Sequence, residues 1–282
     1  MILPASAFLL LFLVIIFTNL LGFSFTFYKG INETFPSINN YATLINSNDF
    51  RQATLRTLIY VLVSTPLQLI FGLCMAFLIN RDFKCKGAVK STFLISMSVP
   101  GVVTSAIFLM LFSFPYGHIN DILTGRFSWF PKLLSAPIKW QGSAVASLGV
   151  SLMADAWKDI PISMLILLAG LQMINKDQYE AAETMGANAF NKLVYITIPL
   201  LMPSISSVLI LRSIEAWKSY LFPFTISPSY PLVSVLIDVF YHSQRNPGLA
   251  ATAAIFLIIF IFIFSMILNF LLKKINSYLI KA

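Results

Sequence analysis

The chain has 282 residues, of which 11% are charged and 58% are apolar, and its mean hydropathy is +0.83. A soluble domain carries about 25% charged residues, so this composition excludes a soluble globular fold and indicates an integral membrane protein. The 19 Lys and Arg exceed the 11 Asp and Glu and give a net charge of +8, which we expect to reflect membrane topology rather than nucleic-acid binding.

Apolar runs of about 20 residues recur along the chain, and each is long enough to cross the hydrocarbon core as a helix. Such runs favour helices over the weakly alternating strands of a barrel. The sequence therefore predicts an all-α integral membrane protein with six transmembrane helices in one domain, 1–282. In chain order, the predicted spans are 4–27, 57–79, 92–113, 144–173, 199–224 and 249–272.

The first predicted span has no preceding Lys or Arg and no clear cleavage site, so we interpret it as a retained span. Several spans contain or begin with proline, which frees a backbone carbonyl and permits a kink. Interrupted helices of this kind are typical of a substrate passage. The prolines concerned are Pro66, Pro100, Pro161, Pro199 and Pro203.

Lys and Arg predict which side of the membrane each loop occupies, because cytoplasmic loops are enriched in them. The loops 80–91, 174–198 and 273–282 carry nine in fewer than fifty residues: Arg81, Lys84, Lys86, Lys90, Lys176, Lys192, Lys273, Lys274 and Lys281. The opposite loops are longer and carry seven: Lys29, Arg51, Arg56, Arg126, Lys132, Lys139 and Arg245. We therefore expect a multi-pass protein of the cell membrane with both termini in the cytoplasm.

The sequence does not indicate a metal site, a disulfide or an enzymatic activity. Cys74 and Cys85, like His118 and His242, have no metal-ligand spacing, so we expect no metal site and no disulfide. The chain has no GxxxxGK[ST] phosphate loop, so we expect it neither to bind ATP nor to act as an enzyme. Asn32 begins a glycosylation sequon, whose use stays open.

A polar, helix-forming segment interrupts the apolar sequence at 174–198. Asp177 and Glu180 have the spacing of a capping box, which predicts that a short helix starts there. Gly186 is placed to end that helix in a left-handed conformation, and Asn188 to cap a second helical stretch before Pro199. The sequence predicts a small helix-turn-helix outside the bilayer.

Six charged residues lie inside the fourth and fifth predicted spans: Asp155, Lys158, Asp159, Arg212, Glu215 and Lys218. Helical spacing places each set of three along one side of its helix. Charges within a membrane usually face a partner or water. Two interpretations stay open: the charges pair with one another, or they form a polar lining with Trp157, Trp217 and Tyr220 that suits a sugar.

The segment Glu180-Ala181-Ala182, Gly186-Ala187, Ile196, Ile198-Pro199 and Pro203 resembles the EAA loop of the membrane subunits of ATP-binding-cassette (ABC) importers. Other stretches resemble the binding-protein-dependent sugar permeases, nearer to the maltose F-type or glycerol-phosphate A-type subunit than to the G-type: Asn39-Asn40-Tyr41, Pro66-Leu67-Gln68-Leu69, Tyr116-Gly117-His118-Ile119-Asn120 and Leu168-Ala169-Gly170-Leu171-Gln172. The family usually has an acidic residue where this chain has Met185.

This resemblance implies a type I ABC importer permease fold with a cytoplasmic coupling helix. It also implies alternating access driven by ATP and Mg bound to a partner ATPase dimer, with a second, G-type-like permease subunit and an extracellular binding protein that delivers the sugar. The coupling residues implied are Glu180, Ala181, Ala182, Gly186 and Ala187. The substrate-binding residues implied are Asp155, Trp157, Lys158, Asp159, Ile162, Glu215, Ala216 and Ser219.

Two other functions are alternatives for a membrane protein of this composition. An ion-gradient-driven secondary transporter acting alone would use the carboxylates within the spans as ion sites, but it leaves the EAA-like segment unexplained. An intramembrane enzyme lacks a serine–histidine or paired-histidine constellation within the spans. The sugar itself, the identity of the partners and the choice between a heterodimeric and a homodimeric permease pair stay open.

Overall fold

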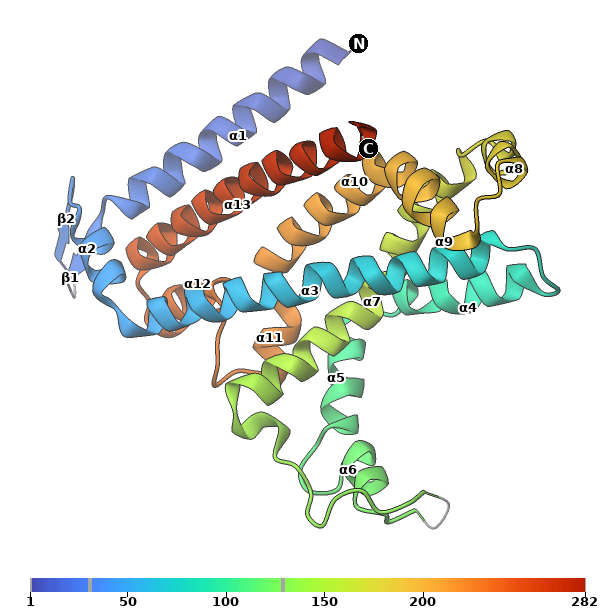
Figure 1. The fold of residues 1–282 in the computed structure, drawn as a ribbon. Helices are drawn as coiled ribbons and strands as arrows, with labels where there is room; N and C mark the ends of the chain where they lie inside the picture. Colours follow the sequence, from blue (N-terminus) through green and yellow to red (C-terminus); the bar gives the residue numbers. More distant parts are fainter. Residues whose placement is uncertain (1, 30–31, 128–129, 282) are drawn as a thin grey trace. The chain divides into compact units, whose positions relative to one another are not determined.

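A computed structural model describes residues 2–29, 32–127 and 130–281, and these residues are largely helical (Figure 1). They divide into two compact units, one of Met1–Leu58 with Pro231–Phe262 and one of Ile59–Tyr230 with Ile263–Ala282. Two long helices, α3 (Asn48–Asn80) and α13 (Pro247–Lys281), contribute to both units. The prediction of a single domain, 1–282, stays a prediction.

The first unit contains a terminal apolar helix and a group of short elements. Besides parts of α3 and α13, it comprises α1 (Ile2–Ser24), β1 (Phe27–Lys29), β2 (Asn32–Thr34), α2 (Asn39–Asn46), α12 (Val233–Asp238) and the π-helical turn η3 (Val239–Ser243). The two strands pair antiparallel with Phe27 opposite Thr34. Large apolar side chains of α1 such as Phe8 and Leu11 are exposed, as expected for a helix in contact with a membrane.

A buried asparagine organises this unit. Asn40 is fully buried, and its Nδ2 donates to the carbonyls of Ser24 at 2.9 Å and Thr26 at 2.8 Å. The Ser24 and Tyr41 hydroxyls are 2.9 Å apart. The side-chain amide thus satisfies carbonyls released where α1 ends, and the Asn-Asn-Tyr motif has a structural role here.

The second unit holds the helices that carry the predicted site. It comprises the rest of α3 and α13 with α4 (Lys86–Ser98), α5 (Gly101–Leu111), α6 (His118–Leu123), η1 (Trp140–Gly142), α7 (Ala144–Gln172), α8 (Lys176–Thr184), α9 (Ala189–Lys192), the π-helical turn η2 (Leu193–Thr197), α10 (Ile198–Trp217) and α11 (Leu221–Ile226). Its main core joins α3, α7, α10 and α13 through residues such as Ile79, Met164, Leu167, Leu201 and Leu272.

α7 and α10 approach closely at Gly170. A β-carbon at this position would lie 2.2 Å from Ser204 Oγ and 2.7 Å from Leu201 Cδ1. Small residues let membrane helices approach each other at van der Waals distance, which compensates for the weak hydrophobic driving force between helices in lipid. The Leu168–Gln172 motif therefore includes the contact between the two helices that flank the polar segment.

The predicted third span, 92–113, consists of two helices, α4 and α5, which are bent by 95° at a short break beside the proline that was expected to permit a kink. Pro100 has no N–H for a helical hydrogen bond, and it disfavours the helical conformation of the residue before it. Val99 is accordingly extended, with φ −74° and ψ 128°. By contrast, Pro66 and Pro161 lie inside the continuous helices α3 and α7.

The other predicted spans agree better with the helices. The fourth, 144–173, matches α7 almost residue for residue. The first, 4–27, extends too far, because α1 ends at Ser24 and β1 begins at Phe27. The fifth, 199–224, is interrupted after Trp217, where a short turn precedes α11.

The second and sixth spans were predicted too short: α3 begins at Asn48 rather than 57, and α13 continues to Lys281 rather than 272. A hydropathy pattern does not detect these extensions, because the residues at the helix ends are polar. Within the described part of the chain, four helical stretches are long and apolar enough to cross a membrane alone, and counting two bent pairs as one span each gives up to six.

The Gly170 contact predicts opposite effects for one substitution at two positions of α7. Gly170→Ala should destabilise the chain by about 1–3 kcal/mol, because the new methyl group overlaps Ser204 and Leu201. Gly149→Ala is the matched control, since a β-carbon there has no neighbour within 4 Å and alanine favours helix by about 1 kcal/mol. Thermal unfolding of the two purified variants in one detergent measures the difference, and equal shifts would contradict the close contact.

Candidate functional site

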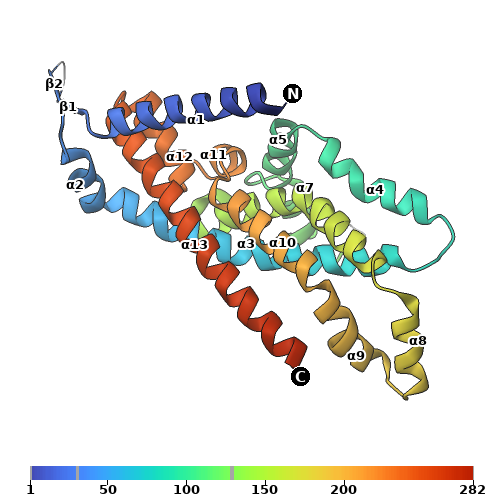
Figure 2. The same cartoon turned by 90° about the horizontal axis from the view of Figure 1, so that it is seen from above.

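The polar segment forms a helical hairpin, which we call the α8–α9 hairpin (residues 174–198). Figures 1 and 2 show it beyond the adjoining ends of α7 and α10. α8 starts at Lys176, and its N-cap is Asn175, whose Oδ1 accepts from the Asp177 N–H at 3.2 Å. The predicted capping box with Asp177 as N-cap is therefore wrong, because Asn175 holds the extended conformation that a cap requires.

Gly186 ends α8 as predicted. Its φ is +81°, in the left-handed region that costs a residue with a β-carbon extra energy. The Gly186 N–H donates to the Glu183 carbonyl, and the Ala187 N–H to the Ala182 carbonyl, each at 2.9 Å. These are the two hydrogen bonds of a Schellman motif, which fix the direction in which the chain leaves the helix.

The second half of the hairpin is also capped as predicted, with Asn188 Oδ1 accepting from the Asn191 N–H at 2.8 Å. Only α9 is a regular helix, and the next five residues form the π-helical turn η2, which the sequence did not predict. Two side-chain contacts hold the halves together. Lys192 pairs with Glu183, and the Tyr179 and Thr197 hydroxyls are 3.0 Å apart.

The five predicted coupling residues lie together on this hairpin. Glu180, Ala181 and Gly186 are exposed, whereas Ala182 and Ala187 are half-buried. Two large apolar side chains accompany them, Met185 at 87% and Phe190 at 69% exposure. The hairpin thus presents a small-residue surface with apolar neighbours to its surroundings, a composition that suits contact with another protein.

A charged cluster (Asp159, Arg212, Glu215 and Lys218) joins α7 to α10. The Arg212 side chain is only 2% exposed, and its Nη1 is 3.2 Å from Asp159 Oδ2. Its Nη2 lies 3.8 Å from Glu215 Oε2, and Lys218 Nζ lies 3.8 Å from Glu215 Oε1. These contacts are the pairing that the sequence left open, and they offset the cost of charges within the membrane.

Asp155 lies on the same side of α7, where it is buried and accepts a hydrogen bond from the Tyr60 hydroxyl at 3.1 Å. Tyr60 comes from α3. It therefore connects α3 to one predicted substrate-binding residue, Asp155. Sequence reasoning missed Tyr60, although a tyrosine in the middle of an apolar span needs a polar partner and is a usable signal.

Lys158 contacts the backbone of α4, and its predicted role in binding the substrate stays a prediction. Its Nζ donates to the Val99 carbonyl at 2.6 Å and to the Met97 carbonyl at 3.4 Å. Both carbonyls belong to the end of α4, where Pro100 interrupts the helix. Lys158 thereby satisfies backbone groups that the 95° bend between α4 and α5 releases.

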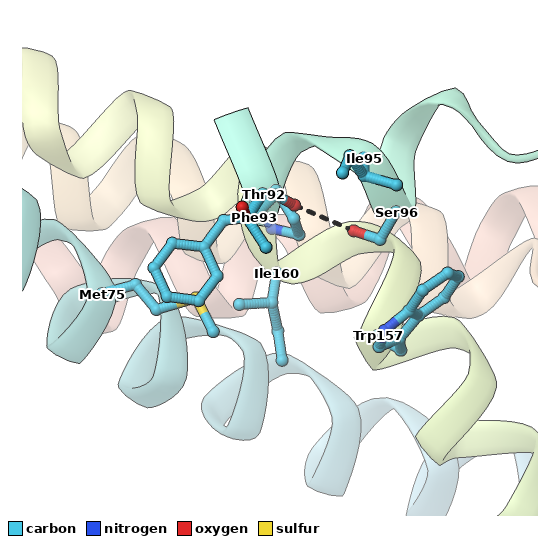
Figure 3. A pocket seen from close by; sticks show the side chains of 8 residues that line it. Met75, Thr92, Phe93, Ile95, Ser96, Trp157 and Ile160 are labelled. Atoms are coloured by element: carbon cyan, nitrogen blue, oxygen red, sulfur yellow. Dashed lines mark hydrogen bonds between the residues drawn. The ribbon is translucent and has the colours of Figure 1, made fainter. Parts of the chain in front are cut away.

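Trp157 faces away from Asp155 and Asp159, because residues two apart on a helix point to opposite sides. It lines a groove of 470 Å³ between α3, α4 and α7 (Figure 3), together with Met75, Thr92, Phe93, Ile95, Ser96, Ile160 and Pro161. The hydroxyls of Thr92 and Ser96 bond carbonyls of their own helix, so the groove wall is essentially apolar. The structure does not bring Trp157 together with the charged cluster.

The remaining predicted residues are less accessible. Ala216 is buried and Ile162 is half-buried. Trp217, which the sequence suggested as a sugar platform, is buried against Phe264 of α13 with ring centroids 5.9 Å apart. Among the described residues, no three His, Cys, Asp or Glu side chains are placed to hold a metal ion.

Residues 68–277 match the family described as "Binding-protein-dependent transport system inner membrane component". The chain belongs to this family. It is 28% identical over 240 residues to the trehalose/maltose transport system permease protein MalF of Thermococcus litoralis, covering 83% of this chain and 79% of the relative. It is 29% identical over 248 residues to the sulfoquinovosyl glycerol transport system permease protein SmoG of Agrobacterium fabrum, covering 86% and 78%.

The fold has a close counterpart among solved structures. A bacterial ABC transporter involved in the import of the acidic polysaccharide alginate superposes with a TM-score of 0.81 at 20% identity, covering 98% of this chain and 94% of that chain. This likeness shows the fold. The predicted family and permease fold are confirmed, as is the multi-pass membrane character, while the orientation of the termini stays a prediction.

The charged cluster predicts unequal effects for two cations, Arg212 within α10 and Lys218 at its C-cap. Arg212→Met should destabilise the chain by about 3–5 kcal/mol, because it leaves the Asp159 carboxylate without its buried partner. Lys218→Met is the control and should change stability by less than about 1 kcal/mol, because Lys218 is 59% exposed and its pair is loose. Thermal unfolding in detergent compares them, and similar losses would refute the central position of Arg212.

Proposed function

We propose that this chain is a permease subunit of an ATP-driven importer and moves a sugar, delivered by an external binding protein, through alternating access. Membership of the binding-protein-dependent family supports this proposal, as do the names of the relatives, which specify trehalose, maltose and sulfoquinovosyl glycerol. The observation that carries it is the α8–α9 hairpin, a capped, internally fastened element that joins the two helices of the charged cluster.

In this proposal the hairpin docks on a cytoplasmic ATPase through Glu180, Ala181, Ala182, Gly186 and Ala187. The small side chains allow a partner backbone to approach, and exposed Met185 supplies apolar contact area in place of the usual acidic residue. ATP and Mg are bound by the ATPase and not by this chain, which has no phosphate loop and is not itself an enzyme. Closure of the ATPase dimer displaces the hairpin and, with it, α10.

The sugar passes along the side of α7 and α10 that carries Asp155, Asp159, Glu215 and Ser219. Carboxylates and hydroxyls at these positions accept hydrogen bonds from sugar hydroxyls, and Ile162 and Ala216 shape the passage. Arg212, at 2% exposure, acts by holding the carboxylates of Asp159 and Glu215.

Trp157 and Lys158 contribute from the α4 side in this proposal. The indole of Trp157 is 41% exposed but lines the groove on the other side of α7, so its predicted contact with the sugar requires a rearrangement of α4 and α7. Lys158 holds the bend between α4 and α5, whose rearrangement changes access to the passage.

The full importer then contains this chain, a second, G-type-like permease subunit, two ATPase subunits and an external binding protein. One solved relative in fold, the bacterial alginate ABC transporter, was crystallised with an alginate pentasaccharide-bound periplasmic protein. The density of Lys and Arg in 80–91, 174–198 and 273–282 supports a cytoplasmic position for both termini, on the ATPase side.

Three substitutions test the coupling role. Gly186→Arg should abolish ATP-dependent uptake while the protein remains inserted, because Gly186 is exposed and the added side chain blocks the docking surface. Any β-carbon at this left-handed position costs about 1–2 kcal/mol, so Gly186→Ala, which adds the strain without the bulk, should retain uptake. Gly87→Arg is the matched control, since Gly87 is exposed, has no neighbour within 4 Å and lies in a loop predicted on the same face. Equal uptake by the two arginine variants would contradict the proposed docking.

The uptake assay uses the whole assembly, purified in mild detergent through a tag on this chain and reconstituted with MgATP and a panel of mono- and disaccharides. An ATPase and a second permease subunit should co-purify, and one sugar should accumulate only with ATP. Uptake by the chain alone, driven by a proton or sodium gradient, would instead identify a secondary transporter.

A further inference from the structure

The α8–α9 hairpin is fastened to the base of α10 at one buried residue. Thr197 is 4% exposed and ends the π-helical turn η2 directly before α10. Its Oγ1 donates to the Lys192 carbonyl at 3.2 Å, which uses the single hydroxyl proton. The Tyr179 hydroxyl, 3.0 Å away, is therefore the donor to Thr197 Oγ1. This bond connects α8 to α10 across 18 positions of sequence.

The backbone at this point is weakly held by its own hydrogen bonds. Pro199 has no N–H to donate to the Tyr195 carbonyl, and its ring crowds that carbonyl. The chain responds with the π-helical turn, in which the Ile198 N–H donates to the Leu193 carbonyl. Pro203, one turn later, also lacks a backbone N–H, so a second helical hydrogen bond is missing. A helix with two such gaps deforms easily unless a side chain fixes it.

The other contact between the two halves of the hairpin, the Glu183–Lys192 ion pair, is more exposed to solvent. The Glu183 side chain is 59% exposed in its pair with Lys192, and exposed ion pairs contribute little to stability. The hydroxyl of Tyr179, by contrast, reaches a buried acceptor at the weak point of the helix. Tyr179 is thus the stronger fastening between the hairpin and α10.

We propose that Tyr179 is a positioning residue that locks the coupling helix α8 to α10, so that both move as one body when the ATPase closes. Because of this hydrogen bond, a movement of the hairpin is transmitted through the turn before Pro199 to the part of α10 that bears Arg212 and Glu215. The inference rests on the proposed coupling function and adds to it Tyr179, which is not among the five proposed docking residues.

Hydrogen–deuterium exchange tests the lock in the full-length chain in nanodiscs. Tyr179→Phe should raise the exchange rates of amides in 193–198 about threefold to tenfold, as expected for the loss of one hydrogen bond. Thr197→Val should act alike, the double variant should add nothing to Thr197→Val, and Thr197→Ser should restore slow exchange. Tyr195→Phe is the control, because that ring is 66% exposed in the same turn.

A second arm uses the importer complex trapped with ATP and vanadate. In the wild type, trapping should change exchange in α10 as well as in α8; in Tyr179→Phe the change in α8 should persist and the change in α10 should fall at least twofold. Unchanged exchange in the first arm, or full transmission to α10 in the second, would overturn the lock. Transmission that Gly186→Arg abolishes and Tyr179→Phe leaves intact would reject the lock and preserve the proposed function.

Discussion

The ion pair between Asp159 and Arg212 is the constraint on which the second unit depends. Its two atoms are 3.2 Å apart and the guanidinium is almost fully buried, so separating α7 from α10 would expose an unpaired charge to an apolar environment. The Gly170 contact joins the same helices nearer the hairpin. Because the α8–α9 hairpin connects their adjoining ends, two helices and one hairpin form a closed frame that links the exposed hairpin surface to the charged cluster.

Proline interrupts the helices of the second unit at Pro100 and at Pro199, and a polar side chain contacts the backbone beside each proline. Lys158 satisfies the carbonyls released before Pro100, and Thr197 occupies the π-helical turn that precedes Pro199. Within a membrane, freed backbone groups need such partners because lipid offers none. Removal of the Lys158 or Thr197 side chain would weaken the local backbone geometry. These two positions therefore stabilise the interrupted helices while leaving them able to move.

The sequence predicted most of this organisation where local chemistry decides it. The fourth span, the left-handed Gly186 and the Asn188 cap follow from hydropathy and capping rules, and the EAA-like segment indicated the family. A kink was expected at Pro66, Pro100 and Pro161 alike, but the 95° break occurs at Pro100 alone of these three, and the proline itself does not specify which helix breaks. Tyr60, Arg212 as the centre of the cluster and the separation of Trp157 from Asp155 depend on which helices become neighbours, which spacing along one chain does not specify.

Photo-crosslinking from the hairpin tests the central claim most directly. A photoreactive amino acid replacing Met185, which is 87% exposed, should crosslink in intact membranes to an ATP-binding subunit identified by mass spectrometry, and ATP with vanadate should change the yield. The same amino acid replacing Val145, equally exposed but predicted on the opposite face, should give no such product. The absence of an ATPase crosslink from Met185, with normal uptake by that variant, would contradict the account.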